Sequence, residues 1–448
     1  MQSIGQAGMT TTSGAESDPI LRARGEVMVH RAQAAEALYR KALETQPDNA
    51  EALNFVAMCE LGRGEFDSAR EHLEKAVHID PEEANFRKNL GILQLALGHA
   101  QDAIDTFDQV IAMDPKELSA PLHRAAALEQ LGSTYDATAA YYHAIATAQA
   151  AFSWRNRNTT PPVLQPVVRH AIDYIQRNQQ QIFMELMQPV RAQYGAAALA
   201  RVEQGLAIYL KHAAAQYPDP RQSCAFFYIP GLSAEPMLDA AHMPGMVALA
   251  TAGDTWLAEL DTAAAEQLGE PYFGTHDLAL LREQGVLDGD TGARLTAWFL
   301  YRNGDREPAA RQHLPRSLAA VESLPQRVQV ENLGPNVYFA TLAPGTHILP
   351  SRGITNARVN MEIPLQVDGR CVRSVAGHEE TWRMGACVAY DGSFAHELWN
   401  HGPGPCTALV LDAWHPELSA AERAALPLLF EGISQFHMAA GVEPPFGN

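Results

Sequence analysis

A repeat of 34 residues in the first third of the chain constrains its fold more than any other feature. Pro47, Pro81 and Pro115 follow one another at this spacing, and each comes directly after a Gln or an Asp. Each unit reads as two short helices, for example "AEALNFVAMCELGRG" followed by "FDSAREHLEKAVHID". Small residues keep the same period, at Gly64, Gly98 and Gly132 and at Ala69, Ala103 and Ala137.

The residue types at these positions suit a stack of helix pairs. Glycine permits a tight helix crossing or a turn, alanine lets helices approach closely, and proline begins a unit without breaking a helix. The period and the small residues resemble the tetratricopeptide repeat. Three units and a partial helix over residues 32–45 reach the number that a stable array needs. The array is expected either to bind a protein or peptide, or another part of this chain, or to act as a stalk or dimerisation arm.

Composition excludes some classes of partner. The net charge of −19 would repel phosphates, so neither nucleic acid nor an anionic membrane is expected as the main partner. No apolar run approaches the roughly 18 residues that span a bilayer, and the N-terminus lacks the pattern of a secretory signal. Five cysteines are scattered without a CxxC pair, which is typical of reduced thiols in a cytoplasmic protein.

The change along the chain from helical repeats to short β-rich runs predicts a multidomain protein. An all-α tetratricopeptide-repeat solenoid is followed by a double-stranded β-helix (jelly-roll) domain. Residues 1–25 are expected to be a disordered lead and residues 26–150 the repeat array. Residues 151–222 are expected to be a helical linker region, with a break at Pro189. Residues 223–448 contain short β-rich runs separated by Gly and Pro, which favours a barrel or jelly roll.

One predicted strand, "RVNMEIPL", has two different faces. Successive side chains of a strand point to opposite sides. Val359, Met361 and Ile363 share one side, and Arg358, Asn360 and Glu362 share the other. The strand follows "PSRGITN", whose Gly and Asn suit a tight turn. The polar side is therefore expected to face either solvent or a lined pocket.

Histidines near the predicted strand ends are further candidates. His396 in "AYDGSFAHELWN" follows a strand and a turn, with Asp391 five residues earlier. A lone histidine at such a place is more often structural than catalytic. His415 in "DAWHPELS" is expected to be structural, and the final helix that follows can begin with a capping box of Ser419 and Glu422.

Four segments carry a resemblance to a known family: "FFYIPGLSAEP", "LAPGTHILPSRGITNARV", "CVRSVAGHEETWRMGACVAYDGSFAHELWN" and "LVLDAWHPELS". Together they resemble the aspartyl/asparaginyl β-hydroxylase family over roughly residues 224–426. The resemblance implies a jelly-roll core that uses Fe(II) and 2-oxoglutarate to hydroxylate side chains, commonly Asp or Asn in a polypeptide. It also implies that two histidines hold the iron without a carboxylate, and the second of them maps onto His396.

The chain departs from the family at the position of the first metal histidine. The Pro350 step and the turn at 353–356 align without a gap, so that position is Ser351. His347 matches another family histidine that is not a ligand, and it is not expected to substitute without a shift of strand register.

The positions implied to hold 2-oxoglutarate also differ. The family's arginine and histidine on the next strand correspond to Asn360 and Glu362, and its carboxylate-gripping arginine corresponds to Cys406. A family serine corresponds to Ala340, whereas Arg358 matches a family arginine that is not the pocket-facing one. A neutral hydroxyl is a poor Fe(II) ligand, loss of an arginine from a buried carboxylate pair costs on the order of 2–5 kcal/mol, and Glu362 would repel a dianion. These replacements argue against standard turnover.

Three hypotheses are consistent with these replacements. In a rebuilt site, Glu362 and His396, with Ser351 or Asn360, hold another metal or act as general acid and base. In a pseudoenzyme, the folded domain binds without catalysis, the repeats recruit a protein, and Glu362 pairs with Arg358 or another cation. In a standard hydroxylase, the alignment shifts locally.

The resulting site assignment is specific. His396 is the expected metal ligand, Glu362 and His396 the catalytic candidates, and Arg358, Asn360 and Ser351 the cofactor contacts. Two arginines outside this set, Arg352 and Arg373, could neutralise an acidic substrate, but a surface position is the commoner case. Trp382 and Trp399 are expected to pack the β domain.

Overall fold

The computed structural model describes residues 18–243, 249, 253–265, 269–272, 295–324 and 327–446. The chain divides into two compact units, Met1–Gln179 with Ala439–Val442 and Gln180–Met438 with Glu443–Asn448. Within the described residues, no helix combines the length and the apolar character needed to cross a membrane.

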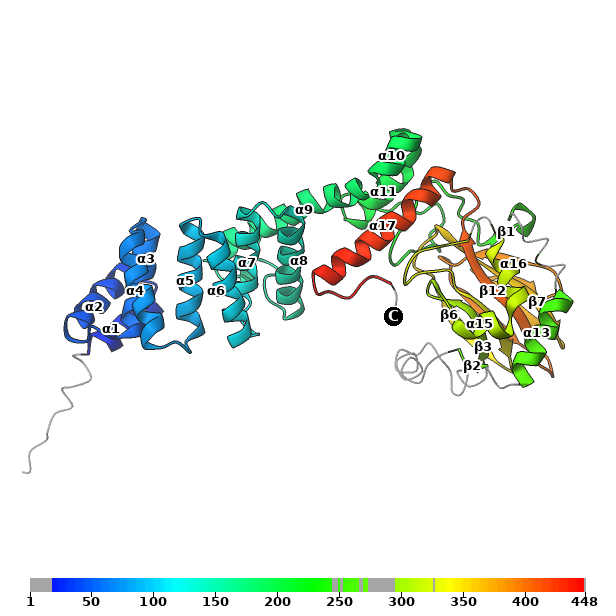
Figure 1. Ribbon diagram of the computed structural model, residues 1–448, viewed down its shortest axis with the longest axis horizontal. Coiled ribbons are helices and arrows are strands. Elements are labelled where there is room, and N and C mark those ends of the chain that lie inside the picture. The colour runs from blue at the N-terminus through cyan, green and yellow to red at the C-terminus, as the bar shows by residue number, and fades with distance from the viewer. Residues whose placement is uncertain are drawn as a thin grey trace, which may run out of the picture. The chain divides into compact units, whose positions relative to one another are not determined.

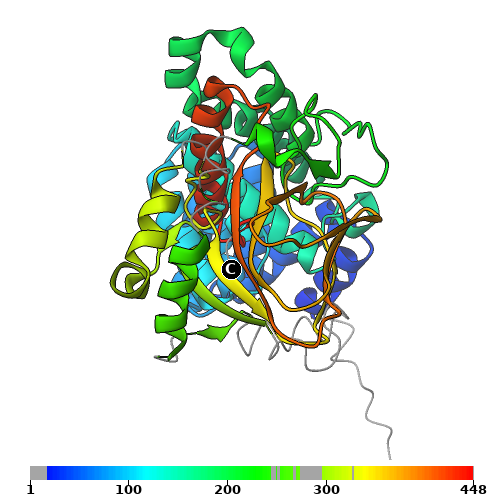
Figure 2. The ribbon, with the colours of Figure 1, turned by 90° about the vertical axis from the view of Figure 1, so that its right-hand side faces the viewer.

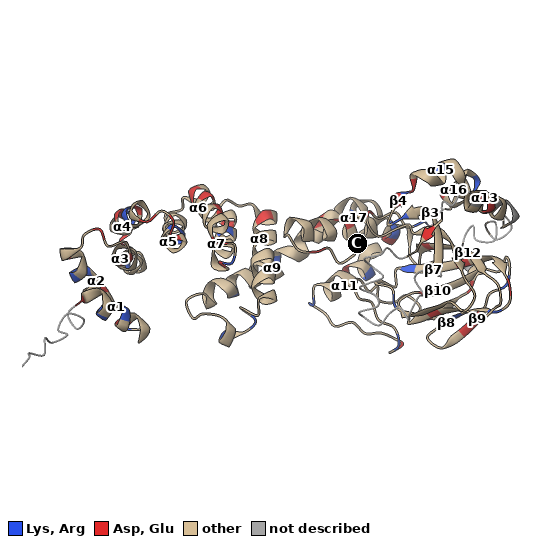
Figure 3. Cartoon of the chain, turned by 90° about the horizontal axis from the view of Figure 1, so that it is seen from below, with Lys and Arg blue, Asp and Glu red and all other residues tan. Residues whose placement is uncertain are grey.

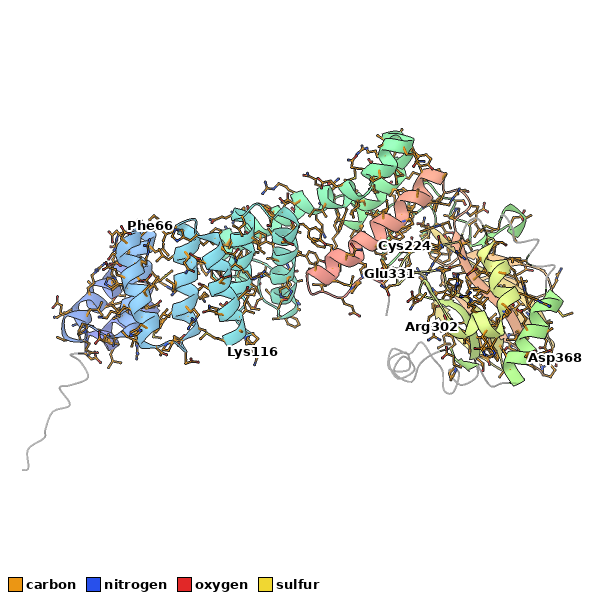
Figure 4. The ribbon with its side chains drawn as sticks, viewed as in Figure 1. Phe66, Lys116, Cys224, Arg302, Glu331 and Asp368 are labelled. Carbon is orange, nitrogen blue, oxygen red and sulfur yellow. The ribbon has the colours of Figure 1, made fainter. Side chains whose placement is uncertain are left out.

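The first unit is built from helix pairs that follow one another along the chain (Figure 1). Its helices are α1 (Pro19–Met28), α2 (Ala32–Thr45), α3 (Ala50–Arg63), α4 (Phe66–Ile79), α5 (Ala84–Ala96), α6 (Ala100–Met113), α7 (Ser119–Gln130) and α8 (Thr134–Ala150). Each odd-numbered helix packs on the next even-numbered one. The predicted pair at residues 50–79 is thus confirmed as α3 and α4, which begins at Phe66 (Figure 4).

The 34-residue period has a direct structural cause. Gly64, Gly98 and Gly132 adopt φ of +80°, +78° and +78°, directly after the first helix of each pair. Only glycine takes this left-handed conformation without steric cost, so the glycine supplies the turn rather than a helix crossing. The alanines of the same period are fully buried between helices.

The disordered lead predicted for residues 1–25 is wrong in its last part, because residues 19–25 belong to α1. Residues 1–17 lie outside the described part of the chain. The Asp18 side chain accepts a hydrogen bond from the backbone N–H of Ile20 at 2.9 Å, which caps the helix. Ile20 and Ala23 are buried with Tyr39 of α2, and this packing stabilises α1. The sequence did not predict the helix because the residues beside it are polar.

Charged side chains of both signs are spread over the repeat helices (Figure 3). Several pairs join neighbouring helices, such as Arg63 of α3 with Glu36 of α2 at 2.8 Å and Arg40 of α2 with Glu60 of α3 at 2.9 Å. The arginines of these pairs are nearly half exposed. Such pairs contribute at most about 1 kcal/mol each, so apolar packing holds the array together.

The helices that follow the repeats are α9 (Gln165–Leu186), α10 (Gln188–Tyr194) and α11 (Ala200–Tyr209), with short 3-10 turns at Arg157–Thr159 and Ala196–Leu199. The predicted break at Pro189 is confirmed, since α9 ends just before it and α10 begins there. Phe183 near the end of α9 packs edge-on against Phe436 of α17 (Ala420–Ala439), with ring centroids 5.5 Å apart. The predicted capping box also forms: Ser419 N–H donates to Glu422, and Glu422 N–H donates to the Ser419 hydroxyl.

The second unit contains two antiparallel sheets. Its strands are β1 (Met237–Leu238), β2 (Glu270–Pro271), β3 (Leu295–Arg302), β4 (Asp305–Arg306), β5 (Val337–Leu342), β6 (His347–Ser351), β7 (Arg358–Val367), β8 (Cys371–Val375), β9 (His378–Thr381), β10 (Val388–Asp391), β11 (His396–Asn400) and β12 (Cys406–Trp414). The larger sheet has the order β1-β10-β7-β12-β5-β3-β2, with β4 paired to β3, and the smaller has the order β6-β11-β8-β9.

Strands β5 to β12 have the connectivity of a jelly roll. The chain passes repeatedly between the sheets, because β5, β7, β10 and β12 lie in the larger one and β6, β8, β9 and β11 in the smaller. The turn from β7 to β8 contains Asp368 (Figure 4). The predicted fold class, a helical repeat array followed by a β-rich jelly roll, is therefore confirmed.

Among the described residues, helices that cover one face of the larger sheet are α13 (Gly253–Ala265), α15 (Pro308–His313) and α16 (Pro315–Glu322) (Figure 2). Trp256 of α13 packs there in one cluster with Phe339 of β5 and Met361 of β7. The other face looks toward the smaller sheet, where Tyr390 and Phe394 belong to a second cluster. The alternation of each strand thus sends one set of side chains under the helices and the other set between the sheets.

Candidate functional site

A cavity of about 310 Å³ opens among residues of both sheets. The larger sheet contributes polar side chains of β7 and β12, and the smaller sheet contributes the ends of β6 and β11. Aromatic and aliphatic residues, among them Tyr338, Tyr390, Ile348, Leu398 and Val410, complete its walls. The volume is at the lower end of the range for small-molecule sites, so the cavity suits a compact ligand.

The polar side of β7 faces this cavity. Arg358, Asn360 and Glu362 all line it. Val359, Met361 and Ile363 lie instead in the core under the covering helices. The alternation predicted from "RVNMEIPL" is confirmed, and of the two environments expected for the polar side, the structure has the lined pocket.

Ser351 and His396 stand opposite each other at the end of the smaller sheet. They are Cα partners across β6 and β11, and both line the cavity. Ser351, the position that the resemblance assigns to the first metal histidine, therefore lies directly across from His396. The Ser351 side chain is exposed at the strand end, whereas His396 is mostly buried.

The tautomer of His396 follows from its hydrogen bond. Nδ1 lies 2.9 Å from the carbonyl oxygen of Phe394, and a carbonyl only accepts, so Nδ1 carries the proton. The lone pair of Nε2 is then left for another group, which is the orientation that metal-binding histidines take. Burial, reinforced by the positive charge of Arg373, lowers the pKa of His396 to about 4. The ring is therefore neutral at physiological pH.

Glu362 is fully engaged by neighbours. Its carboxylate forms a buried ion pair with Arg373 of β8. It also accepts hydrogen bonds from Trp382 Nε1 at 3.0 Å and from the Tyr390 hydroxyl at 3.3 Å. Burial alone would lower the pKa of the Arg373 guanidinium, but the charges of Glu362 and other neighbours outweigh it and hold that pKa above its ordinary value. Glu362 is thus a satisfied structural acceptor.

Arg358 belongs to a second ion pair. Its Nη1 donates to Asp412 of β12 at 2.9 Å and to the carbonyl oxygen of Leu333 at 2.8 Å. The Asn336 backbone N–H donates to the other oxygen of the same carboxylate at 3.1 Å. Burial raises the pKa of Asp412, and Arg358 opposes that shift. Of the two partners expected for Glu362, Arg358 or another cation, the structure therefore has another cation.

Asn360 lies midway between these pairs. Its register partners are Tyr390 on β10 and Asp412 on β12. A side chain on Gly392 would lie only 2.6 Å from the Asn360 Nδ2 atom and 3.8 Å from the His396 ring, so this glycine lets the two groups converge. Among the residues that the structure describes, none forms a hydrogen bond with the Asn360 side chain or with the Ser351 hydroxyl.

Two further sequence predictions concern residues outside the cavity wall. Cys406, at the position of the family's carboxylate-gripping arginine, is buried in the apolar cluster that contains Cys371. His347 stacks on Trp399 with ring centroids 3.4 Å apart, and its Nε2 lies 2.9 Å from a Glu397 oxygen. These contacts hold the His347 ring against residues of β11.

Arg373 is the residue that the sequence reading missed. It was expected at the surface, like Arg352, but its side chain is only 7% exposed and lines the cavity. Arg352 is exposed as expected, and Trp382 is buried as expected. The available signal was strand alternation, because Arg373 shares its face with Cys371 and Val375, which are both fully buried.

Two family models match parts of this chain. Residues 281–416 match the family described as aspartyl/asparaginyl beta-hydroxylase, and residues 28–88 and 60–129 match the tetratricopeptide repeat. A thermophilic tetratricopeptide-repeat protein of Thermus thermophilus aligns with 43% of this chain and 99% of its own, at 18% identity and a TM-score of 0.30.

Curated relatives match the β-rich part. Mouse aspartate beta-hydroxylase domain-containing protein 1 is 32% identical over 135 residues, which cover 30% of this chain and 37% of that protein. Human aspartyl/asparaginyl beta-hydroxylase is 29% identical over 153 residues, which cover 34% of this chain and 20% of that protein. The chain therefore spans only a minor part of the length of these relatives. Its residues 281–416 match the aspartyl/asparaginyl beta-hydroxylase family model, and its N-terminal part matches the tetratricopeptide repeat.

Proposed function

We propose that the β-rich domain is a non-catalytic relative of the hydroxylases, which binds a ligand in its cavity without Fe(II)/2-oxoglutarate turnover. The observation that carries the proposal is the buried Glu362–Arg373 pair in a cavity whose metal end has Ser351 opposite His396. The Glu362–Arg373 pair removes a cation that 2-oxoglutarate would need, and Ser351 removes a ligand that iron would need. These two features lie on different strands.

The donors at the metal end do not fit iron. His396 is oriented as a ligand through its Nδ1–Phe394 hydrogen bond. The partner position holds a neutral hydroxyl, Ser351, which is a weak donor to Fe(II) compared with imidazole. The nearby carboxylates of Glu362 and Asp412 are each tied to an arginine. One imidazole alone is too small a donor set to retain a divalent ion.

The walls do not fit 2-oxoglutarate either. A dicarboxylate needs cations that are free to receive it, but Arg373 and Arg358 each already hold a carboxylate. To bind there, 2-oxoglutarate would have to displace Glu362 or Asp412, and the displaced charge would stay buried. Cys406, in place of the family's gripping arginine, offers no charge.

The rebuilt-site hypothesis, in which Glu362 and His396 act together, is weaker for the same reason. A general base or a metal ligand needs a free lone pair on the reacting side. Arg373, Trp382 and Tyr390 all donate to Glu362, so its oxygens are occupied. We therefore favour binding over catalysis.

The repeats are proposed to bind a protein or peptide partner. Asn54 of α3 and Asn89 of α5 occupy first helices of neighbouring repeats and are joined by a hydrogen bond of 2.8 Å. A side-chain amide can donate to and accept from an extended backbone; the Asn54 amide is partly exposed, and the buried Asn89 amide donates to it. The full chain and its Asn54→Ala/Asn89→Ala variant would be compared in crosslinking with a candidate partner. Equal crosslinking by both would contradict this use of the repeats.

The proposal is tested by ligand-induced stabilisation. The purified full chain is titrated with Mn(II) and 2-oxoglutarate, separately and together, while its melting temperature is followed. A ligand at a hundred times its dissociation constant stabilises a protein by about 2.7 kcal/mol, which gives a clear rise in melting temperature. We expect no rise. A joint rise that His396→Ala abolishes, or succinate formation with Fe(II) and oxygen, would contradict the proposal.

A further inference from the structure

The charges that line the cavity cancel. Arg373 pairs with Glu362, and Arg358 pairs with Asp412 at 2.9 Å. The side chains of Glu362 and Asp412 are 1% and 5% exposed. Because both pairs are intact and screened from water, a charged ligand finds no uncompensated partner among them.

Three polar groups remain available at one end of the same cavity. They are the Asn360 amide, the Ser351 hydroxyl and the Nε2 atom of His396. Within the described part of the chain none of the three has a hydrogen-bond partner. All three are uncharged hydrogen-bonding groups, and together they can donate to a carbonyl and accept from an N–H or O–H.

Apart from Asn336, the remaining walls are apolar or aromatic. Tyr338 and Tyr390 come from the larger sheet, and Ile348 and Leu398 from the smaller one. Such walls stabilise the carbon skeleton of a ligand by removing it from water. A ligand that matches the cavity therefore combines a short apolar body with hydrogen-bonding groups that carry no charge.

We infer that the cavity selects an uncharged, hydrogen-bonding small molecule, and that Glu362 excludes carboxylates by occupying Arg373. The inference rests on the proposed function, since it concerns the same cavity. Glu362 acts as a specificity-determining residue, because it occupies the Arg373 guanidinium with which a ligand's carboxylate would otherwise pair. Without the Glu362 charge, Arg373 would become a buried cation open to a ligand's carboxylate.

A matched pair of compounds tests this inference. Glutaramide and glutarate have nearly the same shape, but glutaramide is neutral and glutarate carries two negative charges. Binding of each to the full chain is measured by titration calorimetry at low ionic strength. We expect the chain to bind glutaramide at least about tenfold more tightly than glutarate. Tighter binding of glutarate, or no binding of glutaramide, would overturn the inference.

The variant Glu362→Gln tests the residue. It keeps the size of the side chain and removes its charge, so glutarate should gain at least about tenfold in affinity while glutaramide changes little. The double variant Glu362→Gln/Arg373→Met removes the freed cation and should lose that gain. If Glu362→Gln does not fold, the comparison of glutaramide with glutarate on the unmodified chain still tests the ligand class. An unchanged glutarate affinity in folded Glu362→Gln would overturn the role of Glu362.

Two controls separate the possible failures. Glu379→Gln makes the same chemical change on β9, where Glu379 forms an exposed pair with Arg370 at 3.4 Å, and it should leave both affinities unchanged. Joint binding of Mn(II) and 2-oxoglutarate would contradict the proposed function. A preference for glutarate without any metal response would contradict only the ligand class inferred above.

Discussion

Ser351 and His396 are Cα partners on neighbouring strands, so the two positions that the family resemblance assigns to metal histidines lie side by side. The surrounding frame is intact. Nδ1 of His396 is held by the Phe394 carbonyl, and the strand that carries Ser351 keeps its pairing to β11. On the proposed function, a single side chain and not the strand pairing is what keeps iron from this end of the cavity.

Ser351→His is therefore expected to create a metal site. Two imidazoles on paired strand ends can chelate a divalent ion, and neutral imidazole binds Fe(II), Co(II) and Ni(II) far better than a hydroxyl does. We expect Co(II) affinity to rise by at least about tenfold, which corresponds to about 1.4 kcal/mol. Titration calorimetry and the Co(II) absorption spectrum measure it.

The matched control is Ser351→His/His396→Ala, which should bind Co(II) no better than the unmodified chain. An affinity unchanged by Ser351→His would mean that the two positions do not converge, in conflict with the register of β6 and β11.

Glu362→Ala is expected to be among the most destabilising single changes in the domain. It leaves the buried Arg373 guanidinium without its carboxylate, and breaking a buried pair in this way costs about 3–5 kcal/mol. Chemical denaturation of the full chain, followed by tryptophan fluorescence, measures the free energy of unfolding. Glu379→Ala, from an exposed pair, should change it by less than about 1 kcal/mol.

The same experiment contains its own check. Adding Arg373→Met to Glu362→Ala removes the orphaned charge, so the double variant should be more stable than Glu362→Ala alone. If the losses of stability caused by Glu362→Ala and by Arg373→Met simply add in the double variant, the two residues are not coupled. The electrostatic account of Glu362 is then wrong.

Stability should depend on pH through His396. Burial and the charge of Arg373 lower its pKa to about 4 in the native state, against roughly 6.5 for an unfolded histidine. Between these values the unfolded state binds a proton that the native state does not, so the free energy of unfolding rises with pH. The contribution is complete above about pH 6.5 and is lost as the pH falls toward 4, by at most about 3 kcal/mol.

Urea denaturation of the unmodified chain and of His396→Gln between about pH 7.5 and 4.5 isolates this contribution. Other histidines titrate in both proteins and cancel in the difference. The free energy of unfolding of the unmodified chain minus that of His396→Gln should decrease as the pH falls. A difference that stays constant over this range would mean that His396 is not held neutral.

The sequence predicted those parts of the fold that depend on local pattern. The 34-residue period placed the helices because glycine, alanine and proline act within one or two turns. The strand predicted from "RVNMEIPL", residues 358–365, lies within β7 and begins at the same residue. The capping box of Ser419 and Glu422 was predicted because its two members are three residues apart.

The wall of the cavity was predicted only in part, because its pairs form between strands. Arg373 and Glu362 come from different sheets, so their pairing depends on which strands face each other. Asp412 and Arg358 are 54 residues apart in the sequence, and the residues next to each of them do not indicate that the two form a pair. Long-range pairing is set by topology and packing, which a single sequence does not display.

Two glycines of the repeats provide a last prediction, in opposite directions. Gly62 and Gly91 both lie inside first helices of the repeats, α3 and α5. A methyl group at Gly62 would meet nothing within 4 Å, whereas at Gly91 it would lie 2.7 Å from the Phe107 ring. Gly62→Ala should therefore stabilise the array by about 0.5–1 kcal/mol, because alanine loses less backbone entropy on folding. Gly91→Ala should destabilise it by about 1–3 kcal/mol through overpacking. Hydrogen exchange of α3 to α6 measures both. Equal effects of the two changes would mean that helix propensity alone, and not the close contact between α5 and α6, decides stability there.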